Sequence, residues 1–142
     1  MSFLLDTCVI SEALTKQPNP KALEFVDHLD PEDVYLSAIT IGELFKGIAK
    51  LPTSRRRSEL QTWFENELLV RYEGKILPLD AGVLITWGKL MARLEADGHV
   101  MPVMDSLIAA IVLTYDMTLV TRNVSDFENS GVQVVNPWAL PT

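Results

Sequence analysis

The sequence is poor in the residues that build disulfide bonds and soft metal sites. Its 142 residues include one cysteine, Cys8, and two histidines, His28 and His99. A lone cysteine excludes an intrachain disulfide, and a reducing cytoplasm is the compartment that we expect for such a chain. These three side chains are also too few for a structural zinc site, which uses four cysteine or histidine ligands. Any bound metal would therefore be a hard cation held by oxygen atoms.

Long apolar runs and flexible linkers are also missing. No apolar run approaches the ~20 residues that span a bilayer, and the first residues lack the basic and apolar regions of a secretory signal. We find no internal repeat, no low-complexity tract and no stretch rich in Gly, Ser or Pro. Hydrophobic residues make up 48% and charged residues 22%, as in soluble globular proteins. We expect a single domain covering residues 1–142.

Basic residues are fewer than acidic ones. Twelve Lys and Arg stand against nineteen Asp and Glu, for a formal net charge of −7. This charge argues against a general nucleic-acid scaffold, which is normally basic. It leaves open both an enzyme that handles a phosphodiester through bound metal ions and a protein that binds a basic partner.

What the sequence does contain is a series of short apolar stretches between helical patterns. Such alternation predicts an α/β domain with a mainly parallel sheet and helices on both faces. We predict about five short strands, the weakest being Ile76–Leu77. The strands are expected at 3–5, 34–36, 76–77, 119–120 and 132–135. The helices are expected at 9–14, 21–29, 40–49, from 54 to about 69, from the cap Asp80 to about 96, and at 106–114.

Four acidic residues stand where the chain changes from one element to the next. Asp6 follows the first strand, Glu43 lies in the first turn of the next helix pattern, Asp105 opens the most apolar helix, and Asp126 follows the fourth strand. The carboxyl ends of parallel strands form the crevice where ligands bind, so all four can face one edge of the sheet. Taken singly, each has a simpler interpretation. The three aspartates suit helix caps or Asx-turns, and Thr40-x-x-Glu43 matches a capping box.

As a set, the four acids predict a site for a hard cation. Carboxylates brought close together raise one another's pKa unless a cation neutralises them. Mg²⁺ and Mn²⁺ prefer carboxylate and water oxygens, and one or two such ions can activate a water and stabilise a leaving oxygen, which is the chemistry of nucleases. We expect Asp6 and Asp105 to ligate the ion directly. Glu43 and Asp126 would bind through water or hold a second ion.

The stretches around these acids resemble the PIN-domain ribonucleases, and more narrowly the VapC-type toxins of type II toxin–antitoxin systems. The resemblance covers nearly the whole chain. It rests on Leu5-Asp6-Thr7-Cys8-Val9-Ile10-Ser11-Glu12, the mid-chain Glu43, Asp105-Ser106-Leu107-Ile108-Ala109-Ala110 and Thr121-Arg122-Asn123-Val124-Ser125-Asp126-Phe127.

The resemblance implies a PIN-like three-layer α/β/α domain, RNA cleavage that depends on Mg²⁺ or Mn²⁺, and a homodimer neutralised by a cognate antitoxin. It matches Asp6, Glu43 and Asp105 to the metal-binding acids of the family. Asp126 matches the more variable fourth acid, and Thr121 a position that is commonly polar.

Other polar residues near the acids are candidates for supporting roles. Thr7, Ser11 and Asn123 can orient metal-bound waters, although local hydrogen bonds at a helix start explain Thr7 and Ser11 equally well. Cys8 is expected to be packed and inert.

Basic residues near the acids are candidates for RNA contact. Lys46 and Lys50, one turn apart on the Glu43 helix, and Arg122 are expected to contact RNA phosphates. The Arg55-Arg56-Arg57 run is better explained as a solvated helix start.

Three alternatives remain open at this stage. One is a PIN-type nuclease of RNA processing without a toxin role, and a second is a non-catalytic binding module whose acids only cap helices. The third is a receiver-like or phosphatase-like domain in which Mg²⁺ serves phosphoryl transfer. That third type of domain needs a Lys after the terminal strand or an Asp-x-Asp pair, whereas here the strand leads into Thr121-Arg122-Asn123 and Cys8 replaces the second Asp.

Overall fold

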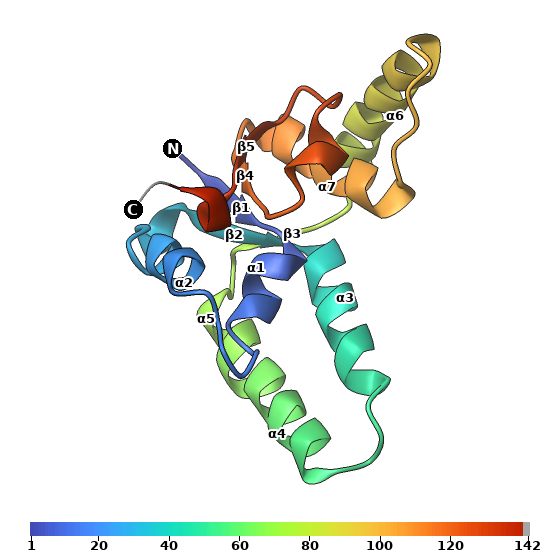
Figure 1. The fold of residues 1–142 in the computed structure, drawn as a ribbon. Coiled ribbons are helices and arrows are strands. Elements are labelled where there is room, and N and C mark those ends of the chain that lie inside the picture. Colours follow the sequence, from blue (N-terminus) through green and yellow to red (C-terminus); the bar gives the residue numbers. More distant parts are fainter. Residues whose placement is uncertain (141–142) are drawn as a thin grey trace.

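The protein is described by a computed structural model covering residues 1–140. Five short parallel strands form one sheet in the order β3-β2-β1-β4-β5 (Figure 1). The strands are β1 (Phe3–Leu5), β2 (Val34–Ser37), β3 (Ile76–Leu77), β4 (Thr118–Val120) and β5 (Gln133–Val135). The predicted five-stranded parallel sheet is therefore confirmed, including its shortest strand.

Helices cover both faces of this sheet. Helices α6 and α7 lie on one face, and α1, α3, α4 and α5 lie on the other (Figure 1). Their bounds are α1 (Thr7–Glu12), α2 (Pro20–Asp27), α3 (Ala38–Ala49), α4 (Arg55–Trp63), α5 (Leu69–Arg71), α6 (Ala81–Ala96) and α7 (Val103–Tyr115), with 3-10 turns η1 (Pro31–Asp33), η3 (Val124–Phe127) and η4 (Pro137–Ala139) and a π-helical turn η2 (Phe64–Leu68).

The alternation of side chains along the strands explains the three layers. In β1, Leu4 packs with α6 and α7, whereas Leu5 packs with α1, α3 and the α4–α5 segment. In β4, Leu119 and Val120 divide between the same two clusters. All four side chains are fully buried. Consecutive apolar residues are what a strand covered on both faces requires, because neighbouring side chains point to opposite faces.

The predicted helices occur, with shifted boundaries. Helix α6 begins after Asp80, whose side chain accepts a hydrogen bond from the Val83 amide, and ends before Gly98, which has a φ of +74°. The long helix predicted from Ser54 runs through α4, the π-helical turn and α5. Phe64 and Leu68, the first and last residues of that turn, lie in the same buried cluster. No helix within residues 1–140 has the length and apolar character needed to cross a membrane.

Three expected helix starts were wrong by two or three residues, and all three concern predicted site residues. Helix α1 was expected from residue 9 and begins at Thr7. Helix α3 begins at Ala38, and its N-cap is Ser37, whose Oγ accepts from the Thr40 amide at 3.0 Å. Thr40 therefore lies inside the helix, and the capping box of Thr40 and Glu43 does not form. Helix α7 begins two residues before Asp105, so Asp105 lies in its first turn and does not cap it.

Candidate active site

Asp6 and Thr121 follow two neighbouring strands at the carboxyl edge of the sheet. Leu5 in β1 pairs with Val120 in β4, so the residues after them emerge side by side. Thr121 Oγ1 donates to Asp6 Oδ2 at 2.7 Å, and the Thr7 amide donates to Asp6 Oδ1 at 2.8 Å. Asp6 is thus the N-cap of α1, in agreement with the interpretation of this residue as a helix cap. The cap uses one lone pair of Oδ1, so the carboxylate keeps acceptor capacity for another partner.

Glu43 reaches the same place from α3, through a contact with Thr7. Thr7 Oγ1 lies 2.6 Å from Glu43 Oε1, a distance typical of a hydroxyl that donates to a carboxylate. Thr7 therefore contacts both acids, Asp6 through its amide and Glu43 through its hydroxyl. Thr7, Ser11 and Asn123 were predicted to support the acids. Among these three, Thr7 is the residue that contacts both Asp6 and Glu43.

Asp105 and Asp126 approach from the opposite face of the sheet. Asp105 lies in the first turn of α7, and Asp126 lies in η3, after β4. Burial raises the pKa of the Asp105 carboxyl from 3.8 to about 6, and the negative charge of Asp126 is the next cause. The charges of Asp6 and Glu43 act in the same direction. The fold therefore brings the four predicted acids into one electrostatic neighbourhood.

Opposing effects act on the pKa of Asp6. Burial raises the pKa of its carboxyl, the hydrogen bonds from Thr121 and Thr7 lower it, and the charges of Glu43 and Asp126 raise it again. The hydrogen bonds favour the ionised form while the neighbouring acids oppose it.

The donor set suits a hard divalent cation. Within residues 1–140, the one ion pair joins Arg55 to Glu59 at 3.0 Å on the exposed side of α4, so no basic side chain neutralises the four acids. As the side chains stand, no three His, Cys, Asp or Glu in that range form a group that holds an ion. Repulsion between uncompensated carboxylates opposes closer approach, and a cation would remove it. Oxygen donors of this kind fit Mg²⁺ or Mn²⁺.

Cys8 lies beside these groups without taking on reactive character. Its Sγ is 3.5 Å from Thr121 Oγ1 and 4.0 Å from Asp6 Oδ2. Burial raises the pKa of the thiol above its ordinary value of 9.0. The side chain is therefore a protonated thiol near neutral pH, which is a poor nucleophile.

The remaining predicted residues are spread around the site. Ser11 lies on α1, one turn beyond Thr7. Asn123 donates its backbone amide to Thr121 Oγ1 at 3.1 Å. The Arg122 guanidinium lies 5.5 Å from the centre of the Trp138 ring, in the C-terminal η4 turn. Trp138 in turn donates its Nε1 proton to Glu12 Oε1 at 3.3 Å. Arg122 is thereby held against the η4 turn.

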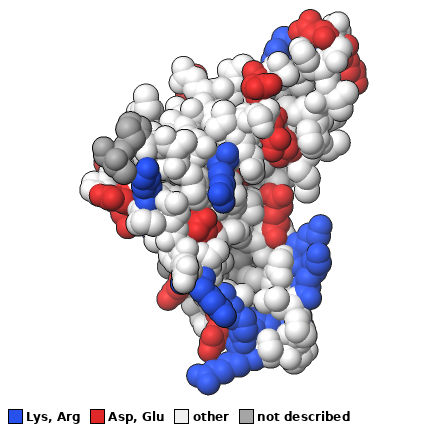
Figure 2. Space-filling model, in the orientation of Figure 1, with Lys and Arg blue, Asp and Glu red and all other residues white. Residues whose placement is uncertain are grey.

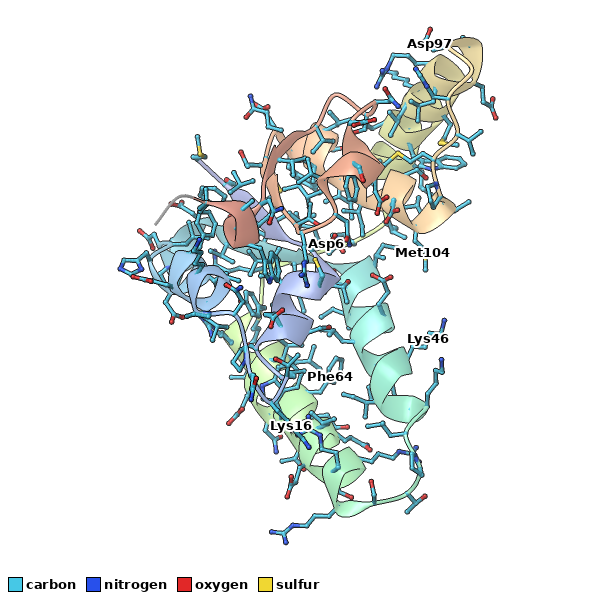
Figure 3. All side chains as sticks on the ribbon, in the orientation of Figure 1. Asp6, Lys16, Lys46, Phe64, Asp97 and Met104 are labelled. Carbon is cyan, nitrogen blue, oxygen red and sulfur yellow. The ribbon has the colours of Figure 1, made fainter. Side chains whose placement is uncertain are left out.

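A cleft along α3 is lined by Glu43 and by two basic residues. Its volume is about 590 Å³, and the residues around it include Glu43, Lys46, Lys50 and, from α7, Met104. Figure 3 shows Lys46 pointing from α3 away from α1 and α4, with Met104 above it. Figure 2 shows basic side chains gathered over the lower part of the molecule, where α3 and α4 lie.

Ser37 and Thr40 were not predicted as part of the site. Both are buried. The Thr40 hydroxyl lies 3.0 Å from Thr7 Oγ1, and the Ser37 hydroxyl lies 3.3 Å from that of Thr40. The signal for Ser37 was present in the sequence, since a serine that ends a strand pattern is a common N-cap. Assigning the cap to Thr40 instead placed its hydroxyl outside the helix and hid its contact with Thr7.

Comparison with known proteins found similar chains along nearly the full length. The family described as PIN domain matches residues 3–129. VapC ribonuclease Y4jK of Sinorhizobium fredii is 37% identical over 95% of this chain and 96% of its own. Toxin FitB of Neisseria gonorrhoeae is 38% identical over 95% and 97%. The structure of FitAB bound to an IR36 DNA fragment aligns with a TM-score of 0.94 at 37% identity, covering 99% of this chain and 98% of that one.

Proposed function

This chain belongs to the PIN-domain family, as its motifs predicted, and we propose that it is a metal-dependent endoribonuclease acting as the toxin of a toxin–antitoxin pair. The observation that carries the proposal is the gathering of four carboxylates without an ion-pair partner in residues 1–140. The charges of the other three acids add to the effect of burial in raising the pKa of Asp105. The names of the relatives, a VapC ribonuclease and a toxin, support the reaction and the biological role.

Asp6 and Asp105 would hold Mg²⁺ or Mn²⁺ directly, and Glu43 and Asp126 would bind it through water or hold a second ion. When bound, the cation supplies an activated water and charge stabilisation at the leaving oxygen. The chain itself fixes the donors. Thr121 and the Thr7 amide hold the Asp6 carboxylate in one orientation, and Thr7 Oγ1 holds Glu43. Rotation of the other two acidic side chains would complete the set.

The α3 cleft is where we propose that RNA binds. Lys46 and Lys50, which suit phosphate oxygens, line it together with Glu43. At Gly42 and Gly47 a side-chain carbon would meet no other atom within 4 Å, so these glycines leave the floor of the cleft open. Arg122 is a further candidate for phosphate contact on the other side of Asp6, where its position is fixed by Trp138.

A cognate antitoxin and a second copy of the chain are the proposed protein partners. The likeness to the FitAB complex supports the antitoxin. The homodimer stays a prediction that light scattering on the purified protein tests. Family membership favours a nuclease over the receiver-like alternative. A role in RNA processing without an antitoxin is distinguished from the toxin role by expressing the protein in cells. A toxin arrests growth when it is expressed alone, and co-expression of its antitoxin restores growth.

The direct test of the reaction is RNA cleavage by the purified protein with added Mg²⁺ or Mn²⁺. We expect cleavage that excess chelator abolishes and that added cation restores, and we expect Asp105→Asn to be inactive. Undiminished cleavage in excess chelator would overturn the metal-dependent mechanism. Absence of cleavage by the folded, cation-loaded protein on a range of RNAs would overturn the nuclease itself.

A further inference from the structure

Five of the twelve lysines and arginines lie in one short segment that contains no acidic residue. The segment, residues 46–57, covers the end of α3, the connection to α4 and the first turn of α4. Its basic residues are Lys46, Lys50, Arg55, Arg56 and Arg57. The rest of the chain is strongly acidic, since the formal net charge of the whole is −7. We call residues 46–57 the basic segment.

The basic segment begins at the α3 cleft and continues beyond it. Lys46 and Lys50 line the cleft together with Glu43, and residues 51–54 connect Lys50 to Arg55. Figure 1 shows this connection at the end of α3 that is farther from the sheet, and Figure 2 shows basic side chains gathered in the same region. A strand of RNA that leaves the cleft at Lys50 would therefore meet the arginines next.

A solvated helix start, the explanation expected for the arginine run, does not account for its charge. The N-terminus of a helix carries a partial positive charge, which favours acids and disfavours cations. Helix α4 has no acidic residue in its first turn, and its cap is the Ser54 side chain, which accepts from the Arg57 amide at 3.1 Å. The positive charges of the arginines therefore contribute nothing to the start of the helix.

The cations of the basic segment keep donors for a ligand. Within residues 1–140, the one ion pair joins Arg55 to Glu59, and an exposed pair of this kind contributes little to stability. The Arg56 guanidinium donates to the Leu14 carbonyl at 3.2 Å and retains its other N–H groups. Both arginines are exposed, so a ligand in solution can reach them.

The chemistry of the basic segment suits a phosphate backbone better than a protein surface. Protein interfaces depend on buried aromatic and aliphatic anchors. Among the described residues, none of the exposed large hydrophobic side chains belongs to residues 46–57. Phe45, just before the segment, packs on Phe64 with ring centres 5.2 Å apart. A phosphate needs only cations, and arginine can bind it with two parallel N–H groups.

We propose that the basic segment binds the sugar–phosphate backbone of RNA beyond the cleft, at a second place several nucleotides from the cleaved bond. Helix α3 rises about 10 Å from Glu43 to Lys50, which corresponds to about three nucleotides of a stacked strand. The arginines follow after that point. Phosphate contacts carry no base specificity, so this surface adds affinity for longer RNA and leaves the choice of cleavage site to the cleft. The inference rests on the proposed function, because it takes RNA as the substrate.

The test removes the three arginine charges together in R55Q/R56Q/R57Q, because glutamine has a helix propensity close to that of arginine. R55K/R56K/R57K keeps the charges. K21Q/R71Q/K89Q is the matched control, since it removes three exposed cations from α2, α5 and α6 and lowers the net charge by the same amount.

The main readout is RNA affinity, measured by fluorescence anisotropy in the D105N background, where we expect no cleavage. The probes are oligouridylates of about 5 and about 20 nucleotides, each at two salt concentrations that differ about fourfold. The active proteins supply kcat and KM for an RNA that the wild type cleaves, and the unfolding temperature verifies that each variant is folded.

We expect the glutamine triple variant to bind the longer probe about tenfold more weakly at the lower salt concentration and the shorter probe with unchanged affinity. Each lost phosphate contact lowers the salt slope by about 0.7, so the salt increase should cost the parent protein roughly tenfold more affinity than it costs the variant. KM should rise while kcat stays the same, because the lost contacts are remote from the cleaved bond. The lysine triple variant and the control should behave as the parent.

Parent-like affinity of the glutamine triple variant for the longer probe would overturn the inference and leave the proposed nuclease intact. An equal loss in the control variant would also overturn it, because net charge alone would then be the cause. If the longer probe bound normally but a co-expressed antitoxin no longer restored growth, the segment would belong to a protein interface instead. Absence of RNA cleavage by the wild type is a separate result, which would overturn the proposed function and the inference with it.

Discussion

Thr121 and Asp6 are 115 residues apart in the chain, and the Thr121 hydroxyl donates to Asp6 Oδ2 at 2.7 Å in the buried edge of the sheet. This bond opposes the burial and the neighbouring negative charges that raise the pKa of Asp6. Thr121 therefore helps to keep Asp6 ionised, which is the form that a cation requires.

Replacing Thr121 tests this relationship. Thr121→Val removes the bond, so the pKa of Asp6 should rise further and the acidic limb of the pH–cleavage profile should move to higher pH. We expect a loss of roughly tenfold in Mn²⁺ affinity at pH 7 that becomes smaller as the pH is raised. Thr121→Ser keeps the hydroxyl and serves as the control. A loss of Mn²⁺ affinity in T121V that is equal at every pH would indicate structural damage instead.

Asp105 predicts a pH dependence of stability in the metal-free protein. Its folded-state pKa is about 6, above the ordinary 3.8, so the folded state binds this proton more tightly than the unfolded state does. Its contribution to stability is fully present below about pH 3.8 and is lost as the pH rises through about 6.

Asp105→Asn removes that titration and one proposed ligand together. In the presence of chelator, D105N should unfold at a higher temperature than the wild type at pH 7.5, and this advantage should shrink as the pH falls from 6 toward 4. Cleavage should decrease by more than about 100-fold, because the amide is a poorer ligand than a carboxylate. Equal unfolding temperatures at pH 7.5 would contradict the raised pKa.

Glu43→Gln separates metal binding from helix stability. Because Ser37 caps α3, the helix does not depend on the Glu43 side chain, and the amide oxygen of glutamine can still accept from Thr7. We expect an unfolding temperature close to that of the wild type in chelator, with weaker Mn²⁺ binding and slower cleavage. If purified E43Q cleaved RNA as fast as the wild type, Glu43 would not be a ligand.

Lys46 and Lys50 predict a salt dependence of RNA binding. Each lysine that neutralises a phosphate of a single strand contributes about 0.7 to the slope of log affinity against log salt concentration. Removing both as K46A/K50A should therefore weaken binding and lower the slope by about 0.7 per contact. Lys89→Ala on α6 is the control, and filter binding of an RNA to the inactive D105N background gives the slope. An unchanged slope would place the RNA elsewhere.

The sequence alone was enough to predict the fold class and to place Asp6 at the carboxyl edge of the sheet. Apolar stretches such as Phe3–Leu5 are local signals, and a residue such as Asp6 that follows a strand must lie at the carboxyl edge of a parallel sheet. The cap at Asp80 is local in the same way, and the structure confirms it.

Only the tertiary structure decided which hydroxyls meet which acids. Thr121 reaches Asp6 because β4 pairs directly with β1, and Thr7 reaches Glu43 because β2 lies on the other side of β1 and carries α3 with it. This order of strands is a global packing result, with no counterpart in local patterning. A shift of two residues in the start of α3 was enough to turn Thr40 from an expected cap into a buried hydroxyl that accepts a hydrogen bond from Thr7.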